Sequence, residues 1–178
     1  MTSYEITTMS AGELINAIGL SIYEPPLVNT KLDHKRRVSE LGVVALFIDF
    51  DTEVQMGGVL SFLENSTGLY LDQTVTALDR IGAHSAAAIM TDVRLIMREL
   101  GITPEHLRGD LSGVEEFSIT TFSQTHGKEA TEMVGKIAEA TGNLFIYDGG
   151  KEDPYALLQE FVSENLGTIK TQLTAATA

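Results

Sequence analysis

The chain has 178 residues, of which 43% are hydrophobic, and this is enough to bury a substantial core. It has no cysteine, which excludes disulfides, thiolate metal sites and a cysteine nucleophile. With 12 basic and 25 acidic residues the formal net charge is −13, so direct binding of DNA or RNA, which needs lysine and arginine, is not expected. The charge predicts a basic protein partner or, alternatively, an acidic surface that serves solubility alone.

The N-terminal segment does not have the pattern of a secretory signal, because no basic stretch is followed by a long apolar run. No window reaches the eighteen or so uncharged apolar residues that a membrane span requires. Neither an internal repeat nor a linker divides the chain. We therefore expect a cytoplasmic protein with a single domain over residues 1–178.

Helices are predicted in succession from the N-terminus. A capping box that begins at Ser10 predicts a helix over residues 10–23, which a pair of prolines ends. A second box that begins at Thr30 predicts a long helix over residues 30–55. Its middle, GVVALFIDF, is apolar nearly all round, and such a helix is typically covered by neighbours on most sides. We expect it to be the central helix of the fold.

Glycines and caps predict the remaining elements. Glycines break the long helix near residue 57 and end two amphipathic helices, and a further short helix begins with a threonine cap and a proline. The helices expected after the break cover residues 72–81, 85–100, 104 onward, 128–141 and 154 onward. Residues 109–125 are predicted to be irregular or weakly helical, and the tail 171–178 to fray. The fold class is all-α, with six to eight helices around the central apolar helix.

The stretch FIDFDTEVQMGG, residues 47–58, resembles the start of a calcium loop, because Asp49, Asp51 and Glu53 occupy alternate positions. A twelve-residue EF-hand loop also needs glycine at its sixth position and glutamate at its twelfth. Val54 and Leu60 stand there instead. We therefore expect neither a calcium site nor any other metal site in this stretch.

No other motif indicates a cofactor or a catalytic residue. The glycine pairs fit neither dinucleotide-binding nor P-loop spacing, and isolated histidines are expected at the surface or at caps. Those histidines are His34, His84, His106 and His126. A carboxylate pair for acid–base catalysis stays open, because 25 acidic residues allow many pairs.

The block EVQMGGVLSFLENSTGLYLDQTVTALDRIGAHSAAAIM, residues 53–90, combines a glycine-pair turn, an Asn-Ser turn, an acidic helix ending in IGA and an alanine-rich helix. In this order it resembles the DMP-type DNA-mimic proteins and their relatives of unknown function, whose pattern runs roughly EVxNGGFxQFFxNSSG. The matching residues are Glu53, Val54, Gly57, Gly58, Phe62, Asn65, Ser66, Gly68, Ala77, Leu78, Ile81, Gly82 and Ala83. Met56, Val59 and Leu63 depart from the pattern.

The resemblance implies an all-α fold, a homodimer and no enzymatic activity. The family's characterised member presents carboxylates in an arrangement similar to DNA phosphates and occupies the DNA-binding face of a repressor. We therefore expect a non-enzymatic acidic protein that binds a basic protein partner, as a DNA mimic that sequesters a DNA-binding regulator. The alternatives are an immunity-type or accessory binding protein without mimicry and a small hydrolase with a carboxylate site.

Within this block, we expect the shared motif to be structural, because its turns must satisfy the free amides of helix starts. The structural residues are Glu53, Gly57, Gly58, Asn65, Gly68 and Gly82. Partner-binding carboxylates are expected on the exteriors of the helices instead. The candidates are Glu64, Asp72, Asp79, Asp92 and Glu99.

Overall fold

The computed structural model describes residues 3–111, 122–144 and 152–177. These residues form ten α-helices and one 3₁₀ helix, with no strand among them. In chain order the elements are α1 (Ser3–Thr8), α2 (Ala11–Ser21), α3 (Leu27–Arg37), α4 (Glu40–Glu64), η1 (Gly68–Tyr70), α5 (Leu71–Arg80), α6 (His84–Glu99), α7 (Pro104–Leu111), α8 (Phe122–Ala140), α9 (Pro154–Glu164) and α10 (Leu166–Thr177). The all-α class is confirmed, and the expected number of helices was too small.

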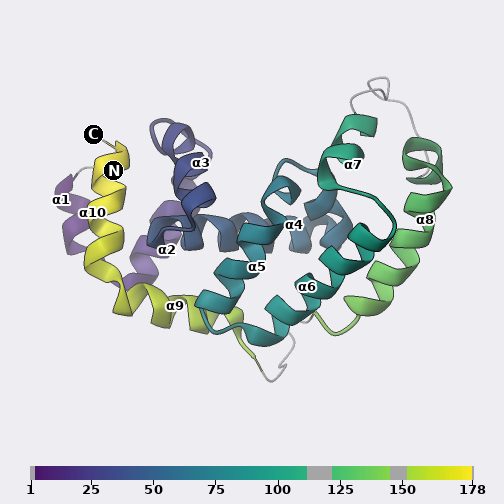
Figure 1. Ribbon diagram of the computed structural model, residues 1–178. Coiled ribbons are helices and arrows are strands. Elements are labelled where there is room, and N and C mark those ends of the chain that lie inside the picture. The colour runs from purple at the N-terminus through teal and green to yellow at the C-terminus, as the bar shows by residue number, and fades with distance from the viewer. Residues whose placement is uncertain (1–2, 112–121, 145–151, 178) are drawn as a thin grey trace.

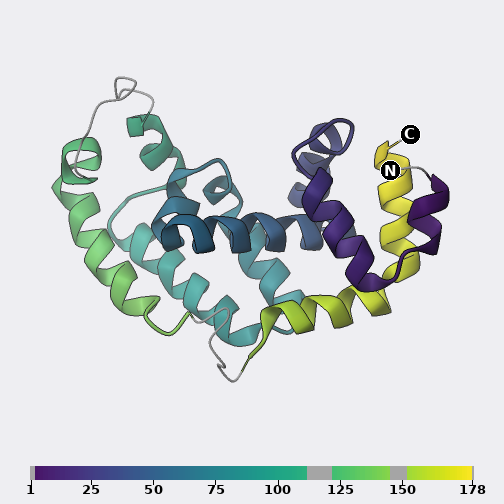
Figure 2. The same ribbon diagram turned by 180° about the vertical axis from the view of Figure 1, so that it is seen from behind.

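Helix α4 runs along the length of the molecule, with α1, α2, α3 and α10 at one end and α7 and α8 at the other (Figure 1). Helices α5, α6 and α9 lie along one of its sides in both views (Figure 2). The first half of α4 contributes a continuous buried run, residues 41–47. The first and last helices lie side by side, since α1 packs against α10 (Figure 2). Among the described residues no helix has the length and apolarity needed to cross a membrane.

The long helix expected over residues 30–55 is in fact two helices. Val38 adopts a left-handed backbone conformation (φ 47°) and ends α3, and the side chain of Ser39 then caps α4 by accepting a hydrogen bond from the amide of Gly42. The apolar spacing continues through this break, so periodicity alone does not reveal it. The two helices pack so closely that a Cβ on Gly42 would lie 2.1 Å from the carbonyl oxygen of His34.

The glycine break expected near residue 57 is confirmed at Gly58, where φ is +74° and α4 kinks. This conformation is costly for a residue that has a Cβ. Across the kink, the rings of Phe50 and Phe62 meet edge to face with centroids 5.4 Å apart. The kink therefore folds the end of α4 back toward the core formed by its first half.

The tail expected to fray is a packed helix as far as Thr177. Leu173 of α10 is fully buried, and the side chain of Gln172 both accepts from the amide of Leu41 (2.8 Å) and donates to Glu40 (2.7 Å). These contacts tie the C-terminal helix to the start of α4. The tail was expected to fray as chain ends usually do, and no local pattern in the sequence indicates these partners because they are more than 130 residues away.

The other predicted helices are confirmed within a few residues: 10–23 by α2, 72–81 by α5, 85–100 by α6 and 154 onward by α9. The capping box at Ser10 is formed on both sides. The helix expected from residue 128 begins earlier, because α8 starts at Phe122 and kinks at Gly127. Of the region predicted to be irregular, α7 takes the first residues and α8 the last, and residues 112–121 lie outside the described ones.

Candidate functional site

Four of the five predicted partner-binding acids lie on the exterior of the hairpin formed by α5 and α6. Asp72 and Asp79 are both exposed, but each already has a cationic or donor partner: Asp72 pairs with Arg94 at 2.9 Å and Asp79 with His84 at 2.8 Å. Their charge is therefore partly compensated at the surface.

Asp92 and Glu99 of α6 are exposed, and no residue in the described part of the chain pairs with either of them. They are seven residues apart, which is close to two helical turns, so both lie on one face of the helix. On this face α6 presents charge that a partner can reach without first breaking an ion pair.

Glu64, the fifth predicted acid, is engaged inside the fold. Its carboxylate lies 2.7 Å from Nε2 of His126, and Asp110 lies 3.0 Å from Nδ1 of the same ring. The His126 side chain is fully buried, whereas those of Glu64 and Asp110 are 25% and 43% exposed. A neutral imidazole donates to only one of two carboxylates, and a doubly protonated one donates to both. We name Glu64, Asp110 and His126 the His126 cluster.

Sequence reasoning placed the histidines at the surface or at caps, which was wrong for His126. Glu64 and His126 are 62 positions apart, and only the packing of α8 beside the end of α4 joins them. The ring of Phe122, one turn earlier in α8, covers the imidazole at a centroid distance of 4.5 Å. The one local signal is that an aromatic and a histidine share a helix face.

The motif residue Glu53 spans the kink of α4. Its carboxylate accepts hydrogen bonds from Oγ of Ser61 (3.1 Å) and from Nδ2 of Asn65 (2.7 Å). The glycines of the motif allow this turn: a Cβ on Gly57 would lie 2.6 Å from Cβ of Ser61, and one on Gly68 would lie 2.5 Å from a backbone oxygen. Glu53 and Asn65 therefore face each other across the turn.

Gly82, the remaining motif residue, follows α5 with φ at +85°. Its neighbour Ala83 is fully buried and donates its amide to the carbonyl of Leu78. The IGA segment thus turns the chain from α5 into α6 and fixes the hairpin that carries the exterior acids.

A second cluster lies where α3 meets the first half of α4, and a buried ion pair stands at its centre. Asp49 receives a hydrogen bond from Nζ of Lys35 at 2.6 Å and another from the hydroxyl of Tyr23 at 2.7 Å. The side chains of Lys35 and Asp49 are each 3% exposed. The ammonium of Lys35 lies 4.0 Å from the ring centroid of Tyr70 and that of Lys31 lies 4.1 Å from Tyr23. We name these five residues the Asp49 cluster.

The surroundings of the Asp49 cluster shift the pKa values of two of its side chains, Tyr23 and Lys31. Burial, and then the hydrogen bond to Asp49, raise the pKa of Tyr23 well above its usual range. Burial lowers the pKa of Lys31. Asp49 is therefore held by two donors, and the first carboxylate of the calcium-like stretch is not available to an ion. Among the described residues no group of histidine and carboxylate side chains could hold a metal ion.

Comparison with known proteins gives one result. The sequence pattern of a family described as "DMP19-like protein" matches residues 39–165, which is well over half of the chain. The match confirms the resemblance drawn from residues 53–90 and extends it in both directions. No curated protein and no solved structure matches the chain.

Proposed function

We propose, from the premise that this chain belongs to the DMP19-like protein family, that it is a non-enzymatic acidic protein that binds a basic protein partner in the cytoplasm. We further propose that it acts as a DNA mimic and competes with DNA for a DNA-binding regulator. The observation that carries the proposal is the pair of exposed, unpaired carboxylates, Asp92 and Glu99, on a helix inside the region that matches the family.

The spacing of this pair supports mimicry. Seven residues along a helix correspond to about 10.5 Å at about 1.5 Å per residue. The phosphates of one DNA strand rise by about 3.4 Å each along the axis and also wind around it, so their separations in space exceed the rise, and the separation of the two carboxylates falls between those of phosphates one and two steps apart. Lysine and arginine on a DNA-binding protein read such spaced charges without reading bases.

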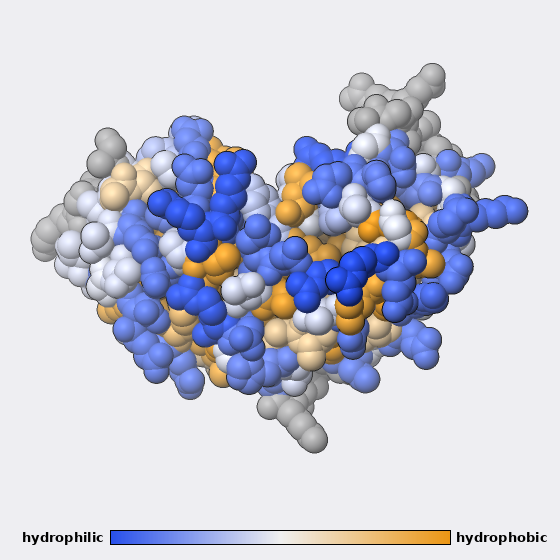
Figure 3. Space-filling model, viewed as in Figure 1, coloured by the Kyte–Doolittle hydropathy of each residue, from blue (hydrophilic) through white to orange (hydrophobic). Residues whose placement is uncertain are grey.

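The overall charge supports the same proposal. A net charge of −13 attracts a basic partner at long range and speeds their encounter. The face shown in Figure 3 is largely hydrophilic, with apolar patches interrupted by polar side chains. Binding that depends on the net charge weakens as salt screens the charges.

The test is capture of partners from a host-cell extract on the immobilised full chain, with and without excess duplex DNA. Mimicry predicts that DNA displaces the captured protein, and that its affinity, measured after purification, falls steeply between 50 and 500 mM salt, a range over which the screening length shrinks from about 14 Å to about 4 Å. A partner that stays bound in excess DNA would instead support the immunity-type or accessory alternative.

A pair of double variants locates the contact. Asp92→Asn with Glu99→Gln removes two unpaired charges and is expected to weaken partner binding about tenfold. The control, Asp72→Asn with Asp79→Asn, makes the same change in net charge on the same hairpin, but it removes acids that are already paired. Equal losses from both double variants would mean that only net charge matters and that α6 is not the contact surface.

The family resemblance adds a homodimer to the proposal. Sedimentation equilibrium of the full chain at micromolar concentration tests it. A monomer at all concentrations would remove this part of the proposal and leave the charge-dependent binding to stand on the variants alone.

A further inference from the structure

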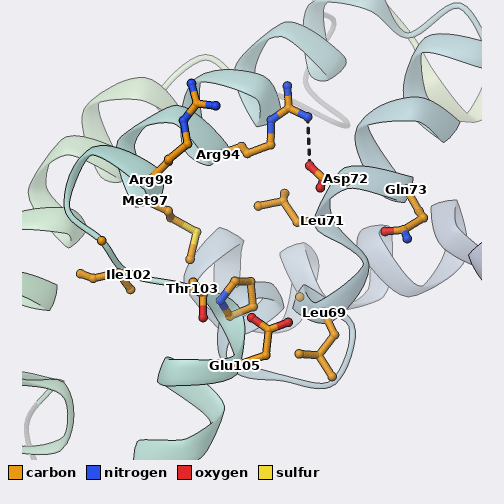
Figure 4. A pocket seen from close by; sticks show the side chains of 13 residues that line it. Leu69, Leu71, Asp72, Gln73, Arg94, Met97, Arg98, Ile102, Thr103 and Glu105 are labelled. Atoms are coloured by element: carbon orange, nitrogen blue, oxygen red, sulfur yellow. Dashed lines mark hydrogen bonds and ion pairs between the residues drawn. The ribbon is translucent and has the colours of Figure 1, made fainter.

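A pocket of about 650 Å³ lies between the start of α5, the second half of α6 and the start of α7. Figure 4 shows Met97 projecting into it, with Leu69, Leu71 and Ile102 around it. The volume is within the usual range for small-molecule sites, about 300–1,000 Å³, which are also mostly apolar with a few placed polar groups. This pocket is separate from the exterior acids of the proposed partner surface, apart from Asp72 at its rim.

Two arginines border the pocket in a chain that has only 12 basic residues. Arg94 is engaged by Asp72, as the dashed contact in Figure 4 shows. Arg98, one turn later on α6, extends along the same edge, and no residue that the structure describes pairs with its guanidinium. The guanidinium of Arg98 therefore offers its N–H donors to a ligand at the rim of a mostly apolar pocket.

One acid faces this arginine edge from the other side. Glu105 of α7 lies across the pocket from Arg94 and Arg98 (Figure 4), and it too has no partner among the described residues. The rim thus has one free positive charge, one ion pair and one free negative charge. A ligand anion at Arg98 gains an attraction there and meets repulsion from Glu105.

We propose that this pocket binds a small amphipathic monocarboxylate, with the carboxylate on Arg98 and the apolar body against Met97 and Leu71. A guanidinium fork matches a carboxylate in a two-bond geometry. A doubly charged phosphate would double both its attraction to Arg98 and its repulsion from Glu105, but its loss of water on entering the apolar pocket would cost more, so the pocket favours a single negative charge. This site does not depend on the proposed partner surface, and it would give the protein a small-molecule ligand in addition to a protein partner.

The probe is 3-phenylpropanoate, titrated into the full-length, isotope-labelled chain and followed by the amide signals of Leu71, Gly101 and Ile102. A dissociation constant on the order of millimolar is expected for a ligand of this size. Its neutral amide, 3-phenylpropanamide, and the dianionic 2-phenylethyl phosphate are both expected to bind more weakly. The absence of saturable shifts up to 10 mM ligand, a concentration of about ten times the expected constant, would overturn the proposal, as would equal binding of the amide.

Three variants separate a charge-specific site from a generic apolar hollow. Arg98→Ala is expected to weaken 3-phenylpropanoate about fivefold, as for a partly exposed ion pair. Glu105→Gln removes the negative charge across the pocket and is expected to strengthen the binding of 3-phenylpropanoate. Arg108→Ala removes an exposed arginine of α7 that does not line the pocket, and no change is expected. If Arg98→Ala and Arg108→Ala have the same effect, long-range charge alone explains binding and no site is present.

Discussion

The long segment of α4 before the kink at Gly58 and the short segment after it each place a carboxylate against a nitrogen partner, but in opposite surroundings. Asp49 in the long segment is almost fully buried with a lysine that is equally buried. Glu64 at the end of the short segment contacts a buried histidine, while a quarter of its own side chain stays exposed. Residues of the same chemical type therefore have different roles, because burial decides whether water can replace a lost partner.

The difference has an energetic consequence. When one partner of a buried ion pair is removed, the other charge is left without water, which costs several kcal/mol. When one partner of a half-exposed pair is removed, the remaining carboxylate is hydrated and the cost is smaller. We make four predictions from this comparison, ordered from the largest expected effect, at the Asp49 cluster, to the smallest, at the start of α4.

The largest effect is expected for Asp49→Ala, which leaves the ammonium of Lys35 buried and unpaired. We expect a loss of about 3–5 kcal/mol in the free energy of unfolding, measured by urea denaturation followed by circular dichroism. Asp92→Ala is the control, because an exposed, unpaired acid should change stability by less than about 0.5 kcal/mol.

The double variant Lys35→Met with Asp49→Leu tests the reason for this loss. It removes both charges and keeps side-chain volume, so it should recover part of the stability lost in Asp49→Ala. A double variant that is less stable than the single one would mean that the pair itself, rather than the uncompensated lysine, carries the stability.

The second effect is at the His126 cluster. His126→Ala removes a fully buried ring but leaves Glu64 and Asp110 reachable by water, so we expect a loss of about 1–3 kcal/mol in the free energy of unfolding. His84→Ala is matched to it, because it also removes a histidine that contacts an aspartate, but at an exposed site. If His126→Ala lost more free energy of unfolding than Asp49→Ala, the buried ion pair would not be the more important of the two contacts.

The third effect tests the kink that separates the long and short segments of α4. Gly58→Ala places a Cβ on a residue with φ at +74°, and we expect a loss of about 1 kcal/mol, although no neighbouring atom would clash with it. Gly135→Ala in α8 is the control, because that glycine has ordinary helical geometry and open space, so alanine should stabilise the helix by about 0.5–1 kcal/mol. The thermal midpoints of both variants measure the contrast.

The smallest effect is a pH dependence at the start of α4. Burial, and then the charge of Arg37, lower the pKa of His34, whose Nδ1 lies 2.8 Å from Oγ of the capping residue Ser39. Because the pKa of His34 is lower in the folded chain, the unfolded chain binds a proton at this histidine more tightly. The folded state therefore keeps its full stability above the unfolded pKa of about 6.5 and loses part of it as the pH falls below that value.

Thermal unfolding between pH 7.5 and 5.5, a range centred on the unfolded histidine pKa of about 6.5, checks this prediction. The wild-type midpoint should fall as the pH decreases, and His34→Gln should reduce the slope. The pKa of Glu40, which also contacts the start of α4, is lowered from a value near 4.5, so its titration lies below this range. An identical slope in His34→Gln would assign the pH dependence to other groups.

Local signals predicted a large part of the fold. The capping box at Ser10, the glycine break at Gly58 and the left-handed glycine at Gly82 each act through the backbone of a few neighbouring residues, and each is present where the sequence indicates it. The motif over residues 53–90 also identified the family. Periodicity failed at Val38, because the apolar stripe of α4 continues past a break that only a backbone conformation reveals.

Which acids are exposed was decided by tertiary packing. The type and order of most helices follow from caps, glycines and apolar spacing, which act over one or two turns of chain. The pairing of Lys35 with Asp49, of Glu64 with His126 and of α10 with the start of α4 depends on contacts between residues 14 to 132 positions apart. The sequence determines which residues carry a carboxylate. Whether that carboxylate contacts water, a buried cation or a binding partner depends on how the helices pack.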